Sequence, residues 1–339
     1  MSLTLPGPAL PAAEPTIAPT VASTLAPVPS PEPAIAHDAP AAPLPTDPTT
    51  APTTAAAPPA VDAYPMPASG WGVAEALDAL AEARLALPLP GVEATVVSAL
   101  TTVVLRVGDV AVKVYPPGTD HEHVARIATA LAGSDTALLP LAAPVVTSWG
   151  VVSVSSWLTS TRPVDWGETG ALLRRFHADH ADADVAAWDP LRRVVTQVAG
   201  LADDDAAVLL DARTALLEEL ARLDSPLGVG VVHGDVSPLN VMHAGARAVL
   251  IDLDFVARAP LEYDLSSPAR RADSGEIDAA TYLAFCRAYG TDVRTWDGRV
   301  VLDRIAQLGG VAFRLWDDRR LGRPLDWVAE AVRTWRTPL

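Results

Sequence analysis

Two polar segments, each following an apolar run, constrain the fold of this chain more than any other feature. Residues 233–240 read His-Gly-Asp-Val-Ser-Pro-Leu-Asn, and residues 251–255 read Ile-Asp-Leu-Asp-Phe. The apolar or β-prone residues before each segment predict buried strands that end where the polar residues begin. We therefore expect two hairpin-like arms that present Asp235, Asn240 and Asp252 on one rim.

This set of polar side chains is typical of a phosphoryl-transfer site. In such a site the protein positions the nucleophile and compensates the charge of the phosphate oxygens through metal ions. Asp235 is predicted to accept the proton of a substrate hydroxyl. Asn240 and Asp252 are predicted to ligate Mg²⁺, which favours oxygen ligands and keeps several waters. The alternative is an ordinary turn, since Gly, Asp, Ser, Pro and Asn all form turns. A turn alone, however, would not require Asp252 after the next strand.

The two segments resemble the aminoglycoside phosphotransferase and choline kinase family of small-molecule kinases. The resemblance is carried by His-Gly-Asp, Asn240 and Ile-Asp-x-Asp, and it extends over residues 94–336. Protein kinases usually carry Arg where Gly234 stands, and they have an Ala-Pro-Glu element that is not found here. Many family members have Leu-His-Pro-Gly before the Asn, whereas this chain has Val-Ser-Pro-Leu. The resemblance implies a protein-kinase-like, two-lobed α+β fold that binds ATP, or another nucleoside triphosphate, with Mg²⁺. Its N-terminal lobe would be an antiparallel sheet and its C-terminal lobe mainly helical.

A nucleotide-binding sheet is predicted upstream of these segments. Residues 94–98, 102–107 and 110–115 are rich in Val and Thr, and Gly-Asp at 108–109 predicts a tight hairpin turn. Ala-Val-Lys, ending at Lys113, matches the spacing of the kinase Val-Ala-Ile-Lys element, whose Lys reaches the α and β phosphates. Lys113 is therefore the predicted nucleotide-contacting lysine. The alternative is a solvent-facing lysine on an edge strand.

Other nucleotide contacts are predicted from their order along the chain. The turn at 98–101 lacks Gly-x-Gly-x-x-Gly, so phosphate contacts would come from backbone N–H groups and the hydroxyls of Ser98 and Thr101. Glu122 is predicted either to pair with Lys113 or to close a helix-capping box with Thr119.

A hairpin over 144–157 is predicted to lead into the hinge between the lobes, where backbone groups would hydrogen-bond adenine at Ser156, Trp157 and Leu158. Residues 138–158 carry no charge, but their prolines and hydroxyl residues fit paired strands better than a membrane span. Helices are predicted at 170–177, 209–223, 277–289, 300–316 and 325–335.

His233 and Asp254 are expected to support the site. In the choline kinase branch an acidic residue two positions after the magnesium Asp lies near the metals, and Asp254 has that place by resemblance. Asp264 resembles part of the family's Asp-Leu-Ala signature and is expected to cap a helix or anchor a loop. His177 and His180 are expected to be packed or solvated, because no Cys or third ligand accompanies them.

The N-terminal residues 1–68 differ in composition from the rest. They hold 18 of the 32 prolines and five acidic residues but no Lys, Arg or Trp. Such a segment buries too little apolar surface to offset its ordering entropy, so it is predicted to be a disordered Pro/Ala-rich tail. An N-lobe over 69–158 and a C-lobe over 159–339 would follow. A signal peptide needs a basic start and an uninterrupted apolar core, whereas residues 1–68 have no Lys or Arg and are interrupted by prolines. The cytoplasm is therefore the expected compartment.

The acceptor is the least constrained part of the prediction. The formal charge of −16 argues against nucleic acid, which is bound through Lys and Arg patches. It is compatible with a cationic hydroxylated acceptor, and five acidic residues lie after the metal motif: Glu262, Asp264, Asp273, Glu276 and Asp278.

The resemblance points to an aminoglycoside-like antibiotic as the leading acceptor of the γ-phosphoryl group. Amino sugars, choline-like amino alcohols and homoserine-like compounds are alternatives within the same class. A non-catalytic nucleotide-binding module and a protein kinase are alternatives from other classes. No membrane partner is expected, and nothing in the sequence indicates an oligomeric state.

Overall fold

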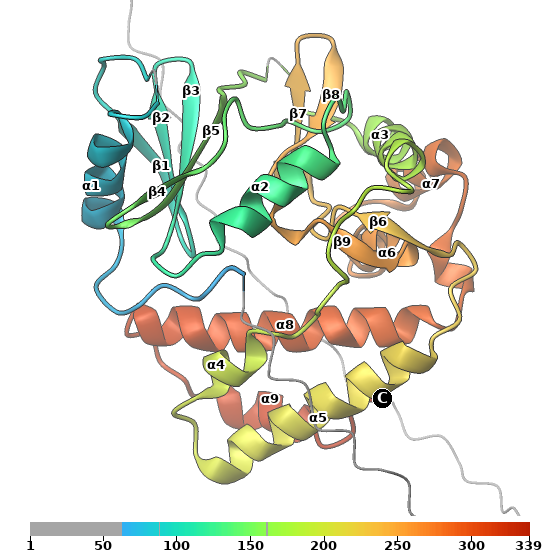
Figure 1. The fold of residues 1–339 in the computed structure, drawn as a ribbon. Coiled ribbons are helices and arrows are strands. Elements are labelled where there is room, and N and C mark those ends of the chain that lie inside the picture. The colour runs from blue at the N-terminus through green and yellow to red at the C-terminus, as the bar shows by residue number, and fades with distance from the viewer. Residues whose placement is uncertain (1–62, 88, 161) are drawn as a thin grey trace, which may run out of the picture. The chain divides into compact units, whose positions relative to one another are not determined.

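A five-stranded antiparallel sheet forms the first part of the fold (Figure 1). Its strands follow the order β1-β2-β3-β5-β4 and are β1 (Thr95–Ala99), β2 (Val103–Val107), β3 (Val110–Tyr115), β4 (Val145–Thr147) and β5 (Gly150–Ser156). Gly108, with φ +60°, makes the predicted turn between β2 and β3. The computed structural model describes residues 63–87, 89–160 and 162–339, all within one compact unit. The predicted tail up to residue 62 lies outside the described residues.

The two faces of the sheet have different roles because side chains alternate along each strand. Leu105 pairs with Val112 across β2 and β3, and both pack under helix α1 (Val73–Ala83). The small side chains of α1, such as Ala76 and Ala79, are completely buried in this contact. Lys113 is on the opposite face of β3, away from α1. This helix was not predicted from the sequence.

A hairpin inserted between the two strands of a small antiparallel sheet positions the polar segments, which lie in the hairpin loops, the loops before and after this hairpin. β6 (Val229–Val232) pairs with β9 (Ala257–Pro260), and β7 (Val241–Ala244) pairs with β8 (Arg247–Leu250). The loop from β6 to β7 contains residues 233–240, ending in the 3₁₀ turn η1 (Pro238–Asn240), and the loop after β8 contains η2 (Leu253–Phe255). Each polar segment thus begins close to the end of a buried strand, as the sequence predicts.

Helices make up the rest of the fold (Figure 1). α2 (His121–Ala130) lies between the five-stranded sheet and the small strands β6 to β9. The helices packed around these strands are α3 (Trp166–Asp179), α6 (Glu262–Asp273) and α7 (Ala279–Tyr289), and η3 (Val293–Thr295) follows α7. The protein-kinase-like fold class predicted from the sequence is confirmed. No helix in the described part of the chain is both long and apolar enough to cross a membrane.

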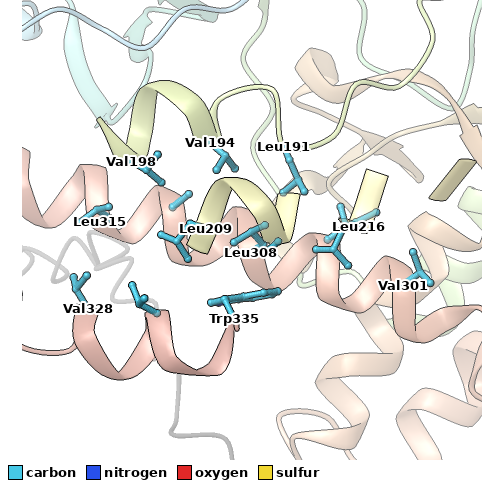
Figure 2. Close-up of a cluster of buried hydrophobic side chains, with 14 residues drawn as sticks. Leu191, Val194, Val198, Leu209, Leu216, Val301, Leu308, Leu315, Val328 and Trp335 are labelled. Carbon is cyan, nitrogen blue, oxygen red and sulfur yellow. The ribbon is translucent and has the colours of Figure 1, made fainter. Parts of the chain in front are cut away.

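A second helical layer consists of α4 (Val194–Val198), α5 (Asp203–Arg222), α8 (Arg299–Arg320) and α9 (Val328–Thr334). Figure 2 shows its core, in which Leu209 and Leu216 of α5 pack with Leu308 of α8 and Trp335. Full burial of each leucine contributes about 1.5–3 kcal/mol. α5 begins at Asp203, six residues before the predicted start, because three Asp side chains in its first turn favour the helix N-terminus.

The folded part starts before residue 69, the predicted end of the tail. Tyr64 is only 3% exposed, and its ring lies 5.5 Å from that of Tyr115 and 5.3 Å from that of His123. The backbone N–H of Asp120 donates to the carbonyl of Ala63 at 2.9 Å. Composition averaged over 68 residues does not reveal one aromatic anchor near their end. The predicted boundary between the lobes at 158/159 stays a prediction.

Candidate active site

The loop after β6 has a backbone that only glycine suits. Gly234 has φ +85°, and a Cβ atom there would lie 2.4 Å from the carbonyl oxygen of Phe255. The loop that follows β8 is therefore pressed directly against the loop that carries Asp235. The backbone N–H of Ile251 also donates to the carbonyl of Asn240 at 2.9 Å, which ties the two polar segments together.

Asp235 and Asn240 are in direct contact. The amide nitrogen of Asn240 donates to the backbone carbonyl and to Oδ2 of Asp235, both at 2.9 Å. Although Asp235 reaches the surface, desolvation by the surrounding protein raises the pKa of its carboxyl, and the charge of Asp252 adds to this. His233 and the bond from Asn240 oppose the rise in pKa. A raised pKa favours proton uptake by this carboxylate.

His233 is held in one tautomer by its neighbours. Its Nε2 lies 2.9 Å from the carbonyl oxygen of Ile251, which only accepts hydrogen bonds, so Nε2 carries a proton. Its Nδ1 accepts the backbone N–H of Asp235 at 3.3 Å, so Nδ1 is unprotonated. The fully buried ring therefore fixes the backbone at Asp235 and does not face the solvent. The supporting role predicted for His233 stays a prediction.

Asp264 anchors the same loop from α6. Its carboxylate accepts the backbone N–H of His233 at 2.7 Å and that of Gly234 at 2.8 Å. His177 of α3 bonds to this carboxylate through Nε2 and to the hydroxyl of Tyr289 through Nδ1, both at 2.9 Å. Asp264 thus lies where a loop anchor is expected, and His177 is a packed, hydrogen-bonded histidine.

Lys113 meets the second polar segment across the two halves of the fold. Its Nζ lies 2.5 Å from Oδ1 of Asp252 and 2.6 Å from Oδ2 of Asp254. Burial alone would lower the pKa of Lys113, but the two carboxylates, Asp254 above all, hold it above its ordinary value. Desolvation likewise opposes ionisation of Asp252, yet the charge of Lys113 and its hydrogen bond lower the pKa of that carboxyl.

Tyr115 fixes the second carboxylate. Two residues after Lys113 on the same face of β3, it donates its hydroxyl to Oδ1 of Asp254 at 2.8 Å. Burial and the negative charge of Asp254 raise the pKa of Tyr115 well above its usual range, so the hydroxyl keeps its proton. Because side chains alternate along a strand, the two-residue spacing from Lys113 could have identified Tyr115 in the sequence.

The structure does not bring Glu122 to Lys113. Glu122 is exposed at the start of α2, and its backbone N–H donates to Asp120, which is the N-cap of this helix. The alternative capping box with Thr119 is also wrong, because Thr119 instead donates its hydroxyl to the carbonyl of Pro116 at 2.8 Å. The lysine finds its carboxylates in the C-terminal half of the fold.

A small pocket lies around Lys113. It is lined by Tyr64, Pro65, Thr101, Thr102, Lys113, Tyr115, Pro116, Arg193, Asp252, Asp254 and Phe255. Thr101 is the one predicted phosphate-loop residue in this lining. Ser98 instead lies on exposed β1, opposite Val104 of β2. The sequence carried no signal for Tyr64, which follows a proline-rich segment, or for Arg193, which precedes the short helix α4.

The predicted hinge follows β5. Ser156 is the last residue of β5 and lies opposite Val110. The backbone N–H of Trp157 donates to the carbonyl of Asp109 at 2.9 Å, and the guanidinium of Arg106 lies over its ring. This N–H is therefore engaged within the sheet. Contacts of Ser156, Trp157 and Leu158 with adenine stay a prediction.

The acidic residues proposed for a cationic acceptor are bonded within the protein. Glu262 accepts from Ser225 and Leu227, Asp264 anchors the loop, Asp273 pairs with Arg299, Glu276 pairs with Arg271, and Asp278 caps α7. These residues do not by themselves indicate an acceptor with ammonium groups.

The oxygen atoms of the site suit Mg²⁺. The described residues contain no cluster of three His, Cys, Asp or Glu side chains ready to hold a metal. Mg²⁺ does not need such a cluster, since it takes one or two carboxylates and completes its shell with phosphate and water. The carboxylate of Asp252 and the amide oxygen of Asn240 are donors of this kind, and Asp254 shares the contact with Lys113 that Asp252 makes.

The fold and this arrangement of side chains define a protein-kinase-like phosphotransferase. The chain belongs to the phosphotransferase enzyme family, whose pattern it matches over residues 91–299. The family consists of small-molecule kinases, as the sequence resemblance implies. No curated protein matches the chain in sequence.

Solved structures share the fold at low sequence identity. The amicoumacin kinase hAmiN in complex with AMP-PNP, Ca²⁺ and Ami is 13% identical, with a TM-score of 0.59, covering 78% of this chain and 93% of that one. The choline kinase LicA from Streptococcus pneumoniae is 12% identical, with a TM-score of 0.56, covering 76% and 95%. A choline/ethanolamine kinase family protein from Mesorhizobium loti is 17% identical, with a TM-score of 0.54, covering 77% and 92%.

Proposed function

We propose that this protein transfers the γ-phosphoryl group of ATP to a hydroxyl group of a small molecule. The observation that carries the proposal is the meeting of Lys113 with Asp252 and Asp254 beside the Asp235–Asn240 contact. A cationic side chain from the sheet and acidic side chains from the hairpin loops are the groups that a phosphoryl-transfer site needs to bind a triphosphate and direct a nucleophile.

Asp235 acts as the proton acceptor for the substrate hydroxyl. Its side chain is exposed and accepts a hydrogen bond from Asn240, its backbone N–H donates to His233, and Asp264 anchors the two residues before it. Lys113 contacts the phosphates of the nucleotide from β3. Asp252 and Asn240 would hold Mg²⁺, with Asp254 in support, and the ion would compensate negative charge on the phosphate oxygens.

The acceptor is proposed at the level of a hydroxylated small molecule. An aminoglycoside-like antibiotic is the acceptor that the sequence resemblance favours. The solved relatives carry names that refer to several acceptors, among them choline, ethanolamine and amicoumacin. Their low identities support the fold and leave the choice among acceptors to experiment.

The test is acceptor-dependent release of ADP by the full-length protein with ATP and Mg²⁺. The panel contains kanamycin, spectinomycin, glucosamine, choline, ethanolamine and L-homoserine. Asp235→Asn should lower the turnover of any active acceptor by about 10²–10⁴-fold while nucleotide binding persists. The matched control is Asp211→Asn, which changes an exposed carboxylate on α5. Nucleotide binding without turnover of any acceptor would favour a non-catalytic nucleotide-binding module.

A further inference from the structure

We propose that Arg270 and Arg271 of α6 bind an anionic group of the acceptor, a carboxylate or a phosphate, and so direct the acceptor's hydroxyl group towards Asp235. The inference rests on the proposed function and narrows its acceptor to an anionic hydroxylated small molecule. It departs from the cationic acceptor that the overall charge allowed, because the acidic residues considered for that acceptor are bonded within the protein.

α6 runs along the loop that carries Asp235. Asp264 of α6 anchors the start of this loop. One turn later, Ser267 donates its hydroxyl to the carbonyl of Val236, which follows Asp235, at 2.8 Å. Residues three or four positions apart are neighbours on a helix surface. Arg271, four residues after Ser267, therefore lies on the side of α6 that faces this loop, one turn beyond this hydrogen bond.

Arg270, Arg271 and Asp235 are near one another and accessible to solvent. Burial lowers the pKa of Arg271, the positive charge of Arg270 adds to this, and the negative charge of Asp235 opposes it. Asp235 is exposed, as are 30% of the Arg270 side chain and 27% of the Arg271 side chain. A dissolved molecule can therefore contact the catalytic carboxylate and the guanidinium groups together.

Both guanidinium groups keep donors for an anion. Arg270 donates through Nη1 to Asp303 at 2.9 Å, and Arg271 donates through Nη1 to Glu276. The Nε and Nη2 groups of the two arginines make no hydrogen bond to any residue that the structure describes. A guanidinium binds a carboxylate or a phosphate through two parallel N–H groups, and Nε with Nη2 provides such a fork.

The two carboxylates that pair with these arginines differ in exposure. Asp303 of α8 is only 8% exposed, so it holds Arg270 in place before an acceptor binds, which reduces the entropy cost of binding. The side chain of Glu276 is 56% exposed. An ion pair this close to solvent contributes little stability, so an anion of the acceptor can compete with Glu276 for Arg271.

Tyr263 adds an uncharged donor beside the arginines. Its ring centre lies 4.2 Å from that of Trp188, and its hydroxyl makes no hydrogen bond within the described part of the chain. Burial raises the pKa of Tyr263 to about 12, so the hydroxyl keeps its proton. Asp235 adds to this rise in pKa and Arg270 opposes it, so the hydroxyl lies near both groups.

The arginines orient the acceptor and take no part in the bond changes. The hydroxyl oxygen of the acceptor forms a bond to the γ-phosphorus of ATP. The bond from this phosphorus to the oxygen that bridges to the β-phosphate breaks, and ADP leaves with the electron pair. The proton of the hydroxyl group passes to Asp235.

Pairs of acceptors with and without an anionic group test the proposal. The pairs are glucuronate and glucose, L-homoserine and L-homoserinamide, and glycerol 3-phosphate and glycerol. Each compound is assayed for acceptor-dependent ADP release by the full-length protein with ATP and Mg²⁺. In at least one pair, kcat/KM should be about tenfold to a hundredfold higher for the anionic member. The pair that shows this effect distinguishes a carboxylate acceptor from a phosphate acceptor.

Arg271→Gln and Glu276→Gln separate acceptor binding from a structural role, because both remove the same ion pair. If Arg271 only fastens the end of α6, the two variants should change KM alike. If Arg271 binds the acceptor, Arg271→Gln should raise KM for the anionic acceptor by about tenfold to a hundredfold and leave KM for ATP unchanged. Glu276→Gln should then leave KM for the anionic acceptor unchanged or lower it. The charge control Arg287→Gln, which alters an exposed arginine on α7, should behave like the wild type.

Thermal unfolding shows whether the two variants are equally stable. If Arg271→Gln melts well below Glu276→Gln, the KM comparison is made with Arg271→Lys, which keeps the charge and loses the fork. A wild-type KM for the anionic acceptor in Arg271→Lys would then overturn the inference.

Two further results would overturn the inference and leave the proposed function intact. One is an equal KM for the anionic acceptor in Arg271→Gln and Glu276→Gln. The other is turnover of glucosamine, choline or ethanolamine with no preference for the anionic member of any pair. Nucleotide binding without turnover of any acceptor would instead refute the proposed function, and with it the inference.

Discussion

Lys113 and Asp254 are 141 residues apart in the sequence, yet the lysine Nζ lies 2.6 Å from Oδ2 of Asp254. The other carboxylate oxygen accepts the hydroxyl of Tyr115 at 2.8 Å. Asp254 is thus the less exposed of the two carboxylates that contact the lysine, with 15% of its side chain exposed against 39% for Asp252, and it links the sheet to the hairpin loops.

Removing this partner should destabilise the protein. Asp254→Asn leaves Lys113 with one carboxylate and weakens the hydrogen bond from Tyr115. We therefore expect the free energy of unfolding to fall by about 1–3 kcal/mol. Tyr115→Phe removes one hydrogen bond and should cost about 1 kcal/mol. Because the side chains of Asp254 and Tyr115 are in contact, the double variant should lower the free energy of unfolding by less than the sum of the two single changes. Denaturant unfolding measures all three, and strictly additive effects would contradict a coupled pair.

Gly234 and Gly245 offer a matched pair of glycine substitutions. Both have positive φ, +85° and +65°, but a Cβ at Gly234 meets Phe255 at 2.4 Å whereas one at Gly245 meets nothing within 4 Å. Gly245→Ala should cost only the backbone strain, about 1–2 kcal/mol. Gly234→Ala should lower the free energy of unfolding by clearly more than Gly245→Ala does. It should also lower turnover, because the loop that carries Asp235 must move. Equal melting temperatures for the two variants would show that the loops are not tightly packed.

Asp235→Asn should stabilise the protein at neutral pH. Its carboxyl has a raised pKa because desolvation and Asp252 disfavour the charge, so the folded state binds more protons than the unfolded state just above the ordinary Asp pKa of about 3.9. Stability therefore falls as pH rises through this window, and the ionised group costs stability above it. The variant should melt higher than the wild type at pH 7, with the difference vanishing below about pH 3.9. A lower melting temperature at pH 7 would contradict the raised pKa.

Asp252→Asn should have the opposite effect. The pKa of this carboxyl is lowered by Lys113 despite desolvation, so ionised Asp252 stabilises the fold above the ordinary Asp pKa. That contribution is lost as pH falls through the lowered pKa. The variant should melt below the wild type at pH 7 and approach it in acid. Melting curves from pH 3 to 7 test this, and a constant difference at all pH values would argue against the ion pair.

Two truncations test where the folded part begins. Removing residues 1–62 keeps Tyr64, whereas removing residues 1–68 deletes this buried side chain and its carbonyl contact with Arg193. The longer deletion should cost stability on the scale of a buried aromatic replaced by alanine, about 3–5 kcal/mol. The shorter deletion should have little effect because that stretch is rich in proline and poor in core-forming residues. Equal melting temperatures would place Tyr64 outside the stable fold.

Local sequence patterns were sufficient for the elements that carry the site. The Val-rich run at 110–115 predicted the strand that carries Lys113, and apolar runs before His233 and Asp252 predicted the strands that precede the two loops. Such patterns work because the geometry of a strand and its turn depends on residues that are neighbours in the chain. The same reasoning failed for α1, whose alanine-rich face gains its stability from packing under the sheet.

The partner of the lysine could not be obtained in this way. Glu122 is the only glutamate between Lys113 and Leu138, but the structure pairs Lys113 with Asp252 and Asp254. Which carboxylate reaches the ammonium group of Lys113 depends on how the sheet packs against the hairpin loops. The spacing of residues along the chain does not predict this packing.

By itself, then, the sequence determined the strands that lead to Lys113, His233 and Asp252, the kinase-like polar residues and the family. Only the tertiary structure decided that Tyr64 and Arg193 line the pocket, that Asp264 anchors the loop before Asp235, and that Glu122 is exposed. The physical reason is that hydrogen bonds between distant segments form only after packing of the core has brought those segments together.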